Sequence, residues 1–176
     1  MPVALRALLS IDALRLPSYR WDETDHWDET DAPPAGLPRR AHQWLDGRDT
    51  FGFNGSVDAC GGGGVVASIS DLAEFLRALF AGGVFDDPET LELMMSAPGH
   101  LPDSPYRLGL FARNFEGHAM FSHGGFWGTD AYVIPRLGLV VAAVALEQNG
   151  VQALRALTRT LMAEHVARAS ATPPPQ

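Results

Sequence analysis

The stretch His118–Asn149, HAMFSHGGFWGTDAYVIPRLGLVVAAVALEQN, decides the fold of this chain. At its centre lies the run His123–Thr129, HGGFWGT, and the segments on both sides of it predict strands. Glycine has no Cβ, so a glycine run lets another molecule approach the backbone and reach its N–H groups. A histidine at the start of such a run can donate, accept or titrate near neutral pH. The stretch therefore predicts part of an active site built on strands.

Strands extend to both sides of this run, because residues there alternate with a period of two or are apolar throughout. The predicted strands are Tyr106–Arg113, His118–Ser122, Ala131–Ile134 and Leu139–Leu146. The first two form a hairpin around a turn at Asn114–Gly117, and the last two flank Pro135–Gly138. The last strand is nearly all apolar, which predicts a central place in the sheet.

The clearest helix follows Ser68-Ile69-Ser70-Asp71, which resembles a capping box, and it ends at Gly82-Gly83. Its apolar face repeats at helical spacing and consists of Leu72, Phe75, Leu76, Leu79 and Phe80. A short second helix begins at Asp87 and Pro88, and we expect it to bury Leu91, Met94 and Met95.

A long helix over Val151–Ala169 closes the domain. Its predicted apolar positions are Val151, Leu154, Leu157, Leu161, Met162 and Val166. The Pro-rich tail Ser170–Gln176 is expected to be disordered.

The N-terminal part of the chain is less regular. Val3–Leu16 predicts a helix, and Arg39–Gly47 a strand end or a short turn. Trp21–Asp31 is a tandem acidic repeat, which is either a site for a hard cation or, as we favour, a solvated acidic loop. Asn54–Gly64 contains four consecutive glycines, but it lacks the lysine of a phosphate loop and the flanking strand of a dinucleotide site. Close backbone packing is the expected reason for those glycines.

The composition excludes several classes of function. The chain has 176 residues, of which 46% are hydrophobic and 19% charged, and this suits one folded soluble domain. A formal net charge of −8 and a pI near 5.1 provide no basic patch, so no nucleic-acid partner is expected. All 13 residues counted as lysine or arginine are arginine, so no lysine can act as a base or form a Schiff base.

Targeting and redox signals are sparse. Cys60 is the only cysteine, so no internal disulfide can form. The N-terminus has no signal peptide pattern, and no apolar run reaches the roughly 18 residues of a membrane span. The localisation stays open: these residues as given carry no address and suit the cytoplasm, whereas export of an intact protein is a further alternative. We expect no cofactor.

The order of these motifs resembles a known family. The segment GGGGVVASISDLAEFLRALFAGGVF, the strand YRLGLF, and FSHGGFWGTDAYVIPRLGLVVAAVALEQN are similar to the C-terminal half of serine β-lactamase-like hydrolases. That family includes class C β-lactamases, related esterases and D-alanyl-D-alanine carboxypeptidases. The resemblance implies an α+β fold, a partial β-lactamase/transpeptidase-like domain over residues 1–169, and a small-molecule ester, amide or peptide substrate.

The resemblance also implies roles for the central run. The family transfers acyl groups through a serine ester. Here His123 would help to position the substrate electrostatically, and Gly124 and Gly125 would let the substrate lie along the strand. The Phe126 N–H would be one of two donors to the oxyanion, worth about 3 kcal/mol per donor. Trp127 would line the acyl or leaving-group pocket, although a packing role is an equal alternative.

Two elements of the family are missing from these residues. The chain has no lysine, so the Ser-x-x-Lys motif that carries the nucleophile does not occur. Tyr19, Tyr106 and Tyr132 all lack the asparagine of a Tyr-x-Asn motif. We therefore expect a C-terminal part of a serine hydrolase that is inactive alone, complemented by the family's N-terminal half or self-associated through exposed apolar surface.

The histidines offer no substitute site. Ser122 and His123 are neighbours on a strand, so their side chains point to opposite faces and are poorly placed to act as nucleophile and base. His118 and His123 also face opposite sides, and no metal is expected. The alternative to a hydrolase part is a non-catalytic module that binds acylated or peptide ligands. Coding sequence upstream of Met1 that contained both missing motifs would favour the hydrolase.

Overall fold

The computed structural model describes residues 20–21, 41–51, 65–97, 99 and 102–171. Its central feature is an antiparallel sheet of four strands in the order β5-β6-β7-β8. The strands are β5 (Phe111–Phe115), β6 (His118–Gly124), β7 (Thr129–Ile134) and β8 (Leu139–Val144). The helices are α2 (Ile69–Phe80), α3 (Pro88–Met95) and α4 (Val151–Ala171). The expected α+β class is confirmed.

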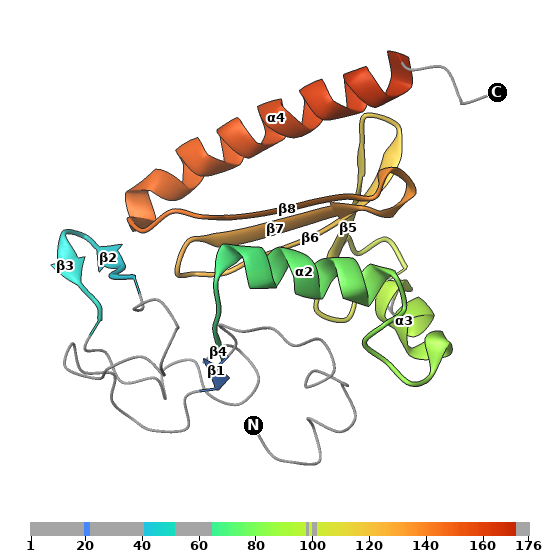
Figure 1. The fold of residues 1–176 in the computed structure, drawn as a ribbon, viewed down its shortest axis with the longest axis horizontal. Helices are drawn as coiled ribbons and strands as arrows, with labels where there is room; N and C mark the ends of the chain where they lie inside the picture. The colour runs from blue at the N-terminus through green and yellow to red at the C-terminus, as the bar shows by residue number, and fades with distance from the viewer. Residues whose placement is uncertain (1–19, 22–40, 52–64, 98, 100–101, 172–176) are drawn as a thin grey trace.

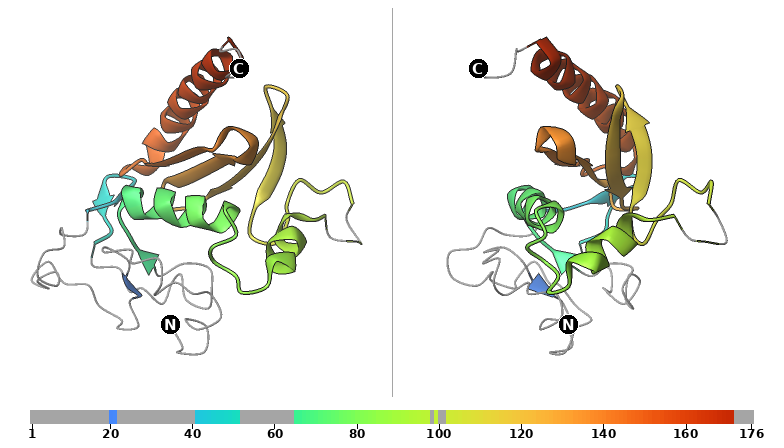
Figure 2. Two further views of the ribbon diagram at one scale, coloured as in Figure 1. Left: turned by 45° about the vertical axis from the view of Figure 1, so that its right-hand side comes forward. Right: turned by 90° about the vertical axis from the view of Figure 1, so that its right-hand side faces the viewer.

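The sheet separates two layers of helix, with α2 along one face and α4 along the other (Figure 1). Side chains alternate along each strand, so neighbouring residues reach different cores. Ala131 and Val133 of β7 pack with Leu76 and Leu79 of α2. Ile134, on the opposite face, packs in a second core with residues of β5, β6 and α4: Phe115, Met120, Met162 and Val166. Figure 2 shows the same layers from two further sides.

The α2 helix forms as its sequence predicts. Ser68 is the N-cap, and its Oγ accepts a hydrogen bond from the backbone N–H of Asp71 at 3.0 Å. Leu76 and Leu79 are buried, and the other three predicted apolar residues are partly buried against the same core. The helix ends at Phe80, just before Gly82-Gly83, and both predicted boundaries are thereby confirmed.

The α3 helix corrects one expectation. Asp87 caps it through a hydrogen bond from the Glu89 N–H at 2.9 Å, as predicted. No residue of α3 is buried, however, and Leu91 and Met94 lie only partly covered against the α2 core. The helix lies at one end of the α2 layer (Figure 1), and Leu91 and Met94 are on the side that packs against that core.

The predicted hairpin is confirmed, but its first strand begins later than the alternation suggests. Tyr106 and Phe111 form an isolated antiparallel bridge, and the Arg107 N–H donates to the Leu110 carbonyl at 2.6 Å. These contacts close a turn over residues 106–110, so the prediction of a strand there is wrong. The turn at the other end is also shorter than predicted, because Phe115 and His118 pair across only two residues.

The β8 strand corrects a second expectation. It stands at the end of the strand order within the described sheet, and all six of its residues are half-buried. The prediction of a central position is therefore wrong for the part of the sheet that the structure describes. Both faces of β8 are apolar because α2 packs on one and α4 on the other.

Two small sheets accompany the main one. Strand β1 (Arg20–Trp21) pairs with β4 (Val65–Val66), and β2 (Trp44–Leu45) pairs with β3 (Arg48–Asp49). The β2–β3 hairpin confirms the short turn predicted near Gly47. The predictions for residues 3–16, 22–38 and 54–64 lie outside the described residues.

The α4 helix lies where the sequence predicts it, but some of its predicted apolar residues are exposed to solvent. It runs to Ala171, slightly beyond the predicted end, and the rest of the tail lies outside the described residues. Val151, Met162 and Val166 are buried, whereas Leu157 and Leu161 are 57% and 53% exposed. Among the described helices, α4 included, none is long and apolar enough to cross a bilayer.

Candidate active site

The C-terminal end of β6 presents an open edge. The pairing of β5 with β6 stops at Phe111 and Ser122, whereas the pairing of β6 with β7 continues to Gly124 and Asp130. The outer edge of β6 at His123 and Gly124 therefore lies beyond the paired part of β5. His123 is exposed while Ser122 is buried, as expected for neighbours on a strand.

Two aromatic rings lie next to His123. The ring centroids of Tyr106 and Phe111 are 6.5 Å and 6.3 Å from that of the imidazole, and the two rings meet edge-on at 4.8 Å. Tyr106 reaches His123 because residues 106–110 form a turn instead of the predicted strand. Tyr106 comes to the site because Pro105 and Gly109 favour a turn here. The alternation of apolar residues in the same segment suggests a strand instead, and the predicted strand follows that alternation.

The turn between β6 and β7 leaves one backbone donor, the Phe126 N–H, without an acceptor among the described residues. The Gly125 N–H donates to the Thr129 carbonyl at 2.7 Å, and the Gly128 N–H donates to the Gly125 carbonyl at 3.2 Å. Between them, the Phe126 N–H has no hydrogen-bond partner among the described residues. Phe126 is 60% exposed, and its ring packs edge-on against that of Trp127, with the ring centroids 5.1 Å apart.

An ion pair between the buried Asp130 and the partly exposed Arg155 lies beneath Gly124. Asp130, which is 4% exposed, accepts hydrogen bonds from Arg155 Nε at 2.7 Å and from Arg155 Nη2 at 3.2 Å. The hydrogen bond to Asp130 raises the pKa of the Arg155 guanidinium. A Cβ on Gly124 would lie 2.2 Å from Asp130 Oδ1 and 3.0 Å from Arg155 Nη2. This packing supplies a structural reason for the first glycine that is independent of any substrate.

Gly124→Ala is therefore expected to lower the free energy of unfolding by about 3 kcal/mol, because the new methyl group must displace a paired carboxylate. Gly125→Ala is the matched control, since in the part of the chain that the structure describes its Cβ would meet nothing closer than the Thr129 carbonyl oxygen at 3.9 Å. Urea unfolding of both variants measures the difference. Equal losses of stability in the two variants would show that the ion pair does not restrict this position.

Tyr132 lies on the opposite side of the sheet from His123. Its side chain packs with the α4 core. Burial raises the pKa of the Tyr132 phenol, and the nearby Asp130 carboxylate raises it further. Tyr132 therefore stays protonated at neutral pH and faces away from the open edge, so it does not replace the tyrosine of a Tyr-x-Asn motif.

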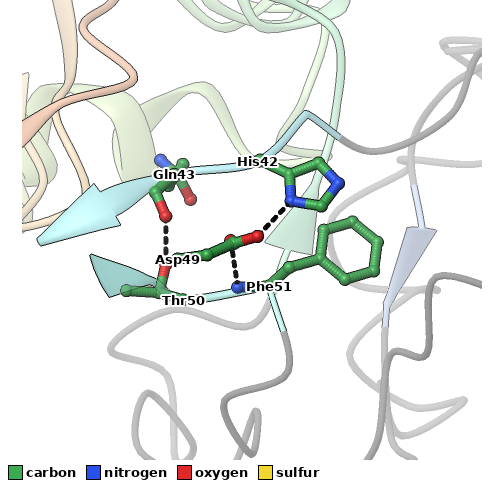
Figure 3. A network of polar contacts seen from close by, with 5 residues as sticks. All are labelled: His42, Gln43, Asp49, Thr50 and Phe51. Carbon is green, nitrogen blue, oxygen red and sulfur yellow. Dashed lines mark hydrogen bonds and ion pairs between the residues drawn. The ribbon is translucent and has the colours of Figure 1, made fainter. Parts of the chain in front are cut away.

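The β2–β3 hairpin, although distant in sequence, forms hydrogen bonds to the β6–β7 turn and to the end of β8. Gln43 Nε2 donates to the Trp127 carbonyl at 2.5 Å, and the Trp44 N–H donates to the Leu146 carbonyl at 2.7 Å. The Thr50 hydroxyl in turn donates to the Gln43 carbonyl at 2.8 Å, as Figure 3 shows. Gln43 thus links the hairpin to the residue that follows Phe126.

The same hairpin carries a histidine–aspartate pair, drawn in Figure 3. His42 Nδ1 lies 2.6 Å from Asp49 Oδ2, the Phe51 N–H donates to Asp49 Oδ1 at 2.9 Å, and the His42 ring stacks on Phe51 at 4.4 Å. Such a pair resembles the base and orienting acid of a triad. No hydroxyl or thiol from the described residues bonds to His42, so the contacts support a role in closing the hairpin.

A metal centre has no counterpart in the described part of the chain. No group of three histidine, cysteine, aspartate or glutamate side chains there is arranged to hold an ion. The acidic repeat lies outside these residues. The chemistry that the described site can offer is hydrogen bonding from an unpartnered backbone N–H, an exposed imidazole and exposed aromatic rings.

Known proteins share this architecture. The sequence matches the family model described as beta-lactamase over residues 14–166. The structure is similar to that of a D-stereospecific amidohydrolase from Streptomyces sp., with a TM-score of 0.62 and 22% sequence identity. That match covers 82% of this chain and 43% of the other, so this chain spans less than half the length of that protein. A comparison with curated proteins finds no match.

Proposed function

The chain belongs to the beta-lactamase family of hydrolases, and on this premise we propose that it supplies the substrate-docking side of a serine acyl-transfer site. The end of β6 receives the acyl group, and the Phe126 N–H donates a hydrogen bond to the acyl carbonyl oxygen. As that oxygen gains negative charge in the tetrahedral intermediate, a fixed donor stabilises it more strongly than it stabilises the substrate.

The observation that carries the proposal is the free Phe126 N–H. Gly125 and Gly128 use their N–H groups to close the turn, whereas no described residue accepts a hydrogen bond from the Phe126 N–H. The turn is fixed from two sides, by the ion pair under Gly124 and by Gln43 on the Trp127 carbonyl. A donor held in this way is preorganised and needs no rearrangement when charge develops.

His123 and Tyr106 lie next to each other at the open edge of β6. The imidazole is exposed on the open edge of β6, and the Tyr106 ring, 41% exposed, lies next to it. We assign His123 the role of positioning the substrate through hydrogen bonding and charge. Gly124 and Gly125 keep this edge free of side chains, so that an extended acyl group can lie along it. The Trp127 ring packs edge-on against the Phe126 ring, and we assign it to the lining of the acyl or leaving-group pocket.

The attacking group is not assigned to any residue of this chain. Ser-x-x-Lys needs a lysine, and the sequence contains none. The chain therefore docks and polarises a substrate without attacking it. A non-catalytic module that binds acylated ligands at the same edge is the second candidate, and the absence of lysine supports it equally.

Replacing Phe126 tests the proposed donor. Phe126→Pro removes the N–H, and we expect the dissociation constant for 6-aminopenicillanic acid, a β-lactam without an aromatic side chain, to rise about fivefold, since one hydrogen bond contributes about 1 kcal/mol. Phe126→Ala removes the ring and keeps the N–H, so its dissociation constant should stay close to that of the unchanged chain. Isothermal titration calorimetry of the three proteins gives the comparison.

One result would contradict the proposed role of the Phe126 N–H. If Phe126→Pro melts cooperatively and still binds the β-lactam as tightly as Phe126→Ala, the N–H does not contact the ligand and the proposed role is wrong. A loss of binding in both variants would assign the contact to the ring instead.

Self-association is the second expectation for the isolated residues. Leu157 and Leu161 lie one turn apart on α4 and are 57% and 53% exposed, which leaves apolar surface for another copy to cover. Sedimentation velocity should show species larger than the 19.0 kDa monomer, and Leu157→Gln combined with Leu161→Gln should return it to a monomer. Ala153→Gln with Ala156→Gln is the control on exposed positions of the same helix. A sharp monomer with a cooperative melt in the unchanged chain would refute the expectation.

A further inference from the structure

The hydrogen bonds of the β6–β7 turn form a chain that begins at Gln43. Gln43 Nε2 donates to the Trp127 carbonyl at 2.5 Å, and the Gly128 N–H donates to the Gly125 carbonyl at 3.2 Å. The Trp127 carbonyl and the Gly128 N–H belong to one peptide group, and the Gly125 carbonyl and the Phe126 N–H belong to another. The chain therefore leads from the Gln43 amide, through two peptide groups, to the N–H that has no acceptor among the described residues.

A peptide group transmits polarisation from its carbonyl to its N–H. When the carbonyl oxygen accepts a hydrogen bond, electron density moves toward that oxygen through the partial double bond, and the N–H of the same group becomes a better donor. Each bond in such a chain strengthens the next by roughly 10–30%. Gln43 thus increases the donor strength of the Gly128 N–H, and the bond from Gly128 increases that of the Phe126 N–H.

The β2–β3 hairpin fixes the start of this chain. Thr50, which is 1% exposed, donates to the Gln43 carbonyl from its backbone N–H at 2.9 Å and from its hydroxyl at 2.8 Å (Figure 3). The next residue, Trp44, donates its N–H to the Leu146 carbonyl at 2.7 Å. With its backbone held in this way, Gln43 presents the NH₂ of its side chain to the Trp127 carbonyl, which can only accept a hydrogen bond.

We propose that Gln43 is a positioning residue for the Phe126 N–H: its amide orients the β6–β7 turn and polarises the two peptide groups that end at this donor. The inference deepens the proposed function, and its effect on a ligand rests on that function. It gives a residue 84 positions before Trp127 a part in ligand binding. The effect should be greatest for an oxygen that gains negative charge, because hydrogen bonds to charged acceptors are the stronger ones.

Gln43→Met tests the chain of hydrogen bonds, because it removes the donor and keeps the length of the side chain. In ¹H–¹⁵N spectra without ligand, we expect the amide protons of Gly128 and Phe126 to shift upfield. The Gly125 amide, whose bond to the Thr129 carbonyl lies outside the chain, should move little. The dissociation constant for 6-aminopenicillanic acid should rise about threefold, since a weaker and less firmly held donor makes a poorer hydrogen bond.

Three further variants make the result specific. Gln43→Arg places an Nε–H as many bonds from the backbone as Gln43 Nε2, so the Gly128 and Phe126 amides should keep their positions. Gln43→Glu has the same length without a donor and should give the upfield shifts, which covers the case in which Gln43→Met fails to fold. Gln152→Met makes the methionine replacement at an exposed position of α4 and should change neither spectra nor binding.

Combining Gln43→Met with Phe126→Pro separates an effect through the donor from a general loosening of the turn. If Gln43 acts through the Phe126 N–H, its replacement should not raise the dissociation constant further once that N–H is absent. Another threefold rise in the double variant would overturn the inference. Unmoved Gly128 and Phe126 amides in Gln43→Met, or upfield shifts of the same size in Gln43→Arg, would overturn it as well.

The spectra without ligand do not depend on the proposed function. If Phe126→Pro binds 6-aminopenicillanic acid unchanged while Gln43→Met moves the two amides, the acyl-binding role fails and the chain of hydrogen bonds remains. Amides that stay unmoved in Gln43→Met, together with weaker binding in Phe126→Pro, would refute the role of Gln43 and leave the acyl-binding edge.

Discussion

Gly128→Ala is expected to destabilise the fold by about 4 kcal/mol or more, a large share of the roughly 5–15 kcal/mol that holds a domain together. A Cβ at this position would lie 2.2 Å from the backbone oxygen of Ala145, and φ is +84°, where an L side chain is strained by about 1–2 kcal/mol. The Gly128 carbonyl also accepts the Ala145 N–H at 3.0 Å, so the two segments cannot move apart without losing that bond. Thermal and urea unfolding should show loss of most of the cooperative transition.

Gly138→Ala is the matched control for that result. Gly138 also has a positive φ, +60°, but a Cβ there would meet no atom of the described residues within 4 Å. Only the conformational strain remains, so its loss should be about 1 kcal/mol. A Gly128→Ala protein as stable as the Gly138→Ala protein would contradict the close approach of the β6–β7 turn to the end of β8.

The unmodified 176 residues are expected to hydrolyse neither a chromogenic β-lactam nor a short p-nitrophenyl ester above the rate in buffer. Enzymes of this kind accelerate their reactions by about 10⁶-fold or more, and that acceleration needs an attacking group in addition to an oxyanion donor. The chain has no lysine to activate a serine in the family's way, and within the described part of the chain Ser122 is buried beside His123 on the opposite face of β6. Absorbance assays at micromolar protein concentration measure the rate.

An active β-lactamase of the same family, assayed in parallel, shows that the substrates and conditions support turnover. A burst of product from this chain that a serine-reactive phosphonate abolishes would mean that the chain carries a nucleophile of another kind. The assignment of these residues to the docking side alone would then be wrong.

Local patterns predict much of this fold because the decisive contacts are close in sequence. The Ser68 cap, the apolar stripe of α2 and the long α4 helix depend on residues three or four positions apart. The β5–β6 hairpin is predictable for the same reason. Where two local signals compete, at Tyr106–Leu110, the alternation of apolar residues suggests a strand, whereas the proline and glycine form a turn.

The support of the candidate site could not be predicted in this way. Asp130 and Arg155 are 25 positions apart, and Gln43 and Trp127 are 84 apart, so no spacing in the sequence signals either contact. The exposure of Leu157 and Leu161 likewise depends on what packs against α4 and not on the helical repeat. The run from His123 to Phe126 is recognisable from its motif. The structure adds that the Gly125 and Gly128 N–H groups form hydrogen bonds within the turn, whereas the Phe126 N–H has no acceptor among the described residues.

The most direct test of the docking role is the amide proton of Phe126 in ¹H–¹⁵N spectra of residues 1–176 during a titration with 6-aminopenicillanic acid. We predict a saturable downfield shift of this resonance as its N–H meets the ligand carbonyl, while the Gly125 amide, already bonded to Thr129, moves little. A ligand that binds and leaves the Phe126 amide unmoved, or a chain that binds no β-lactam at all, would contradict the docking role.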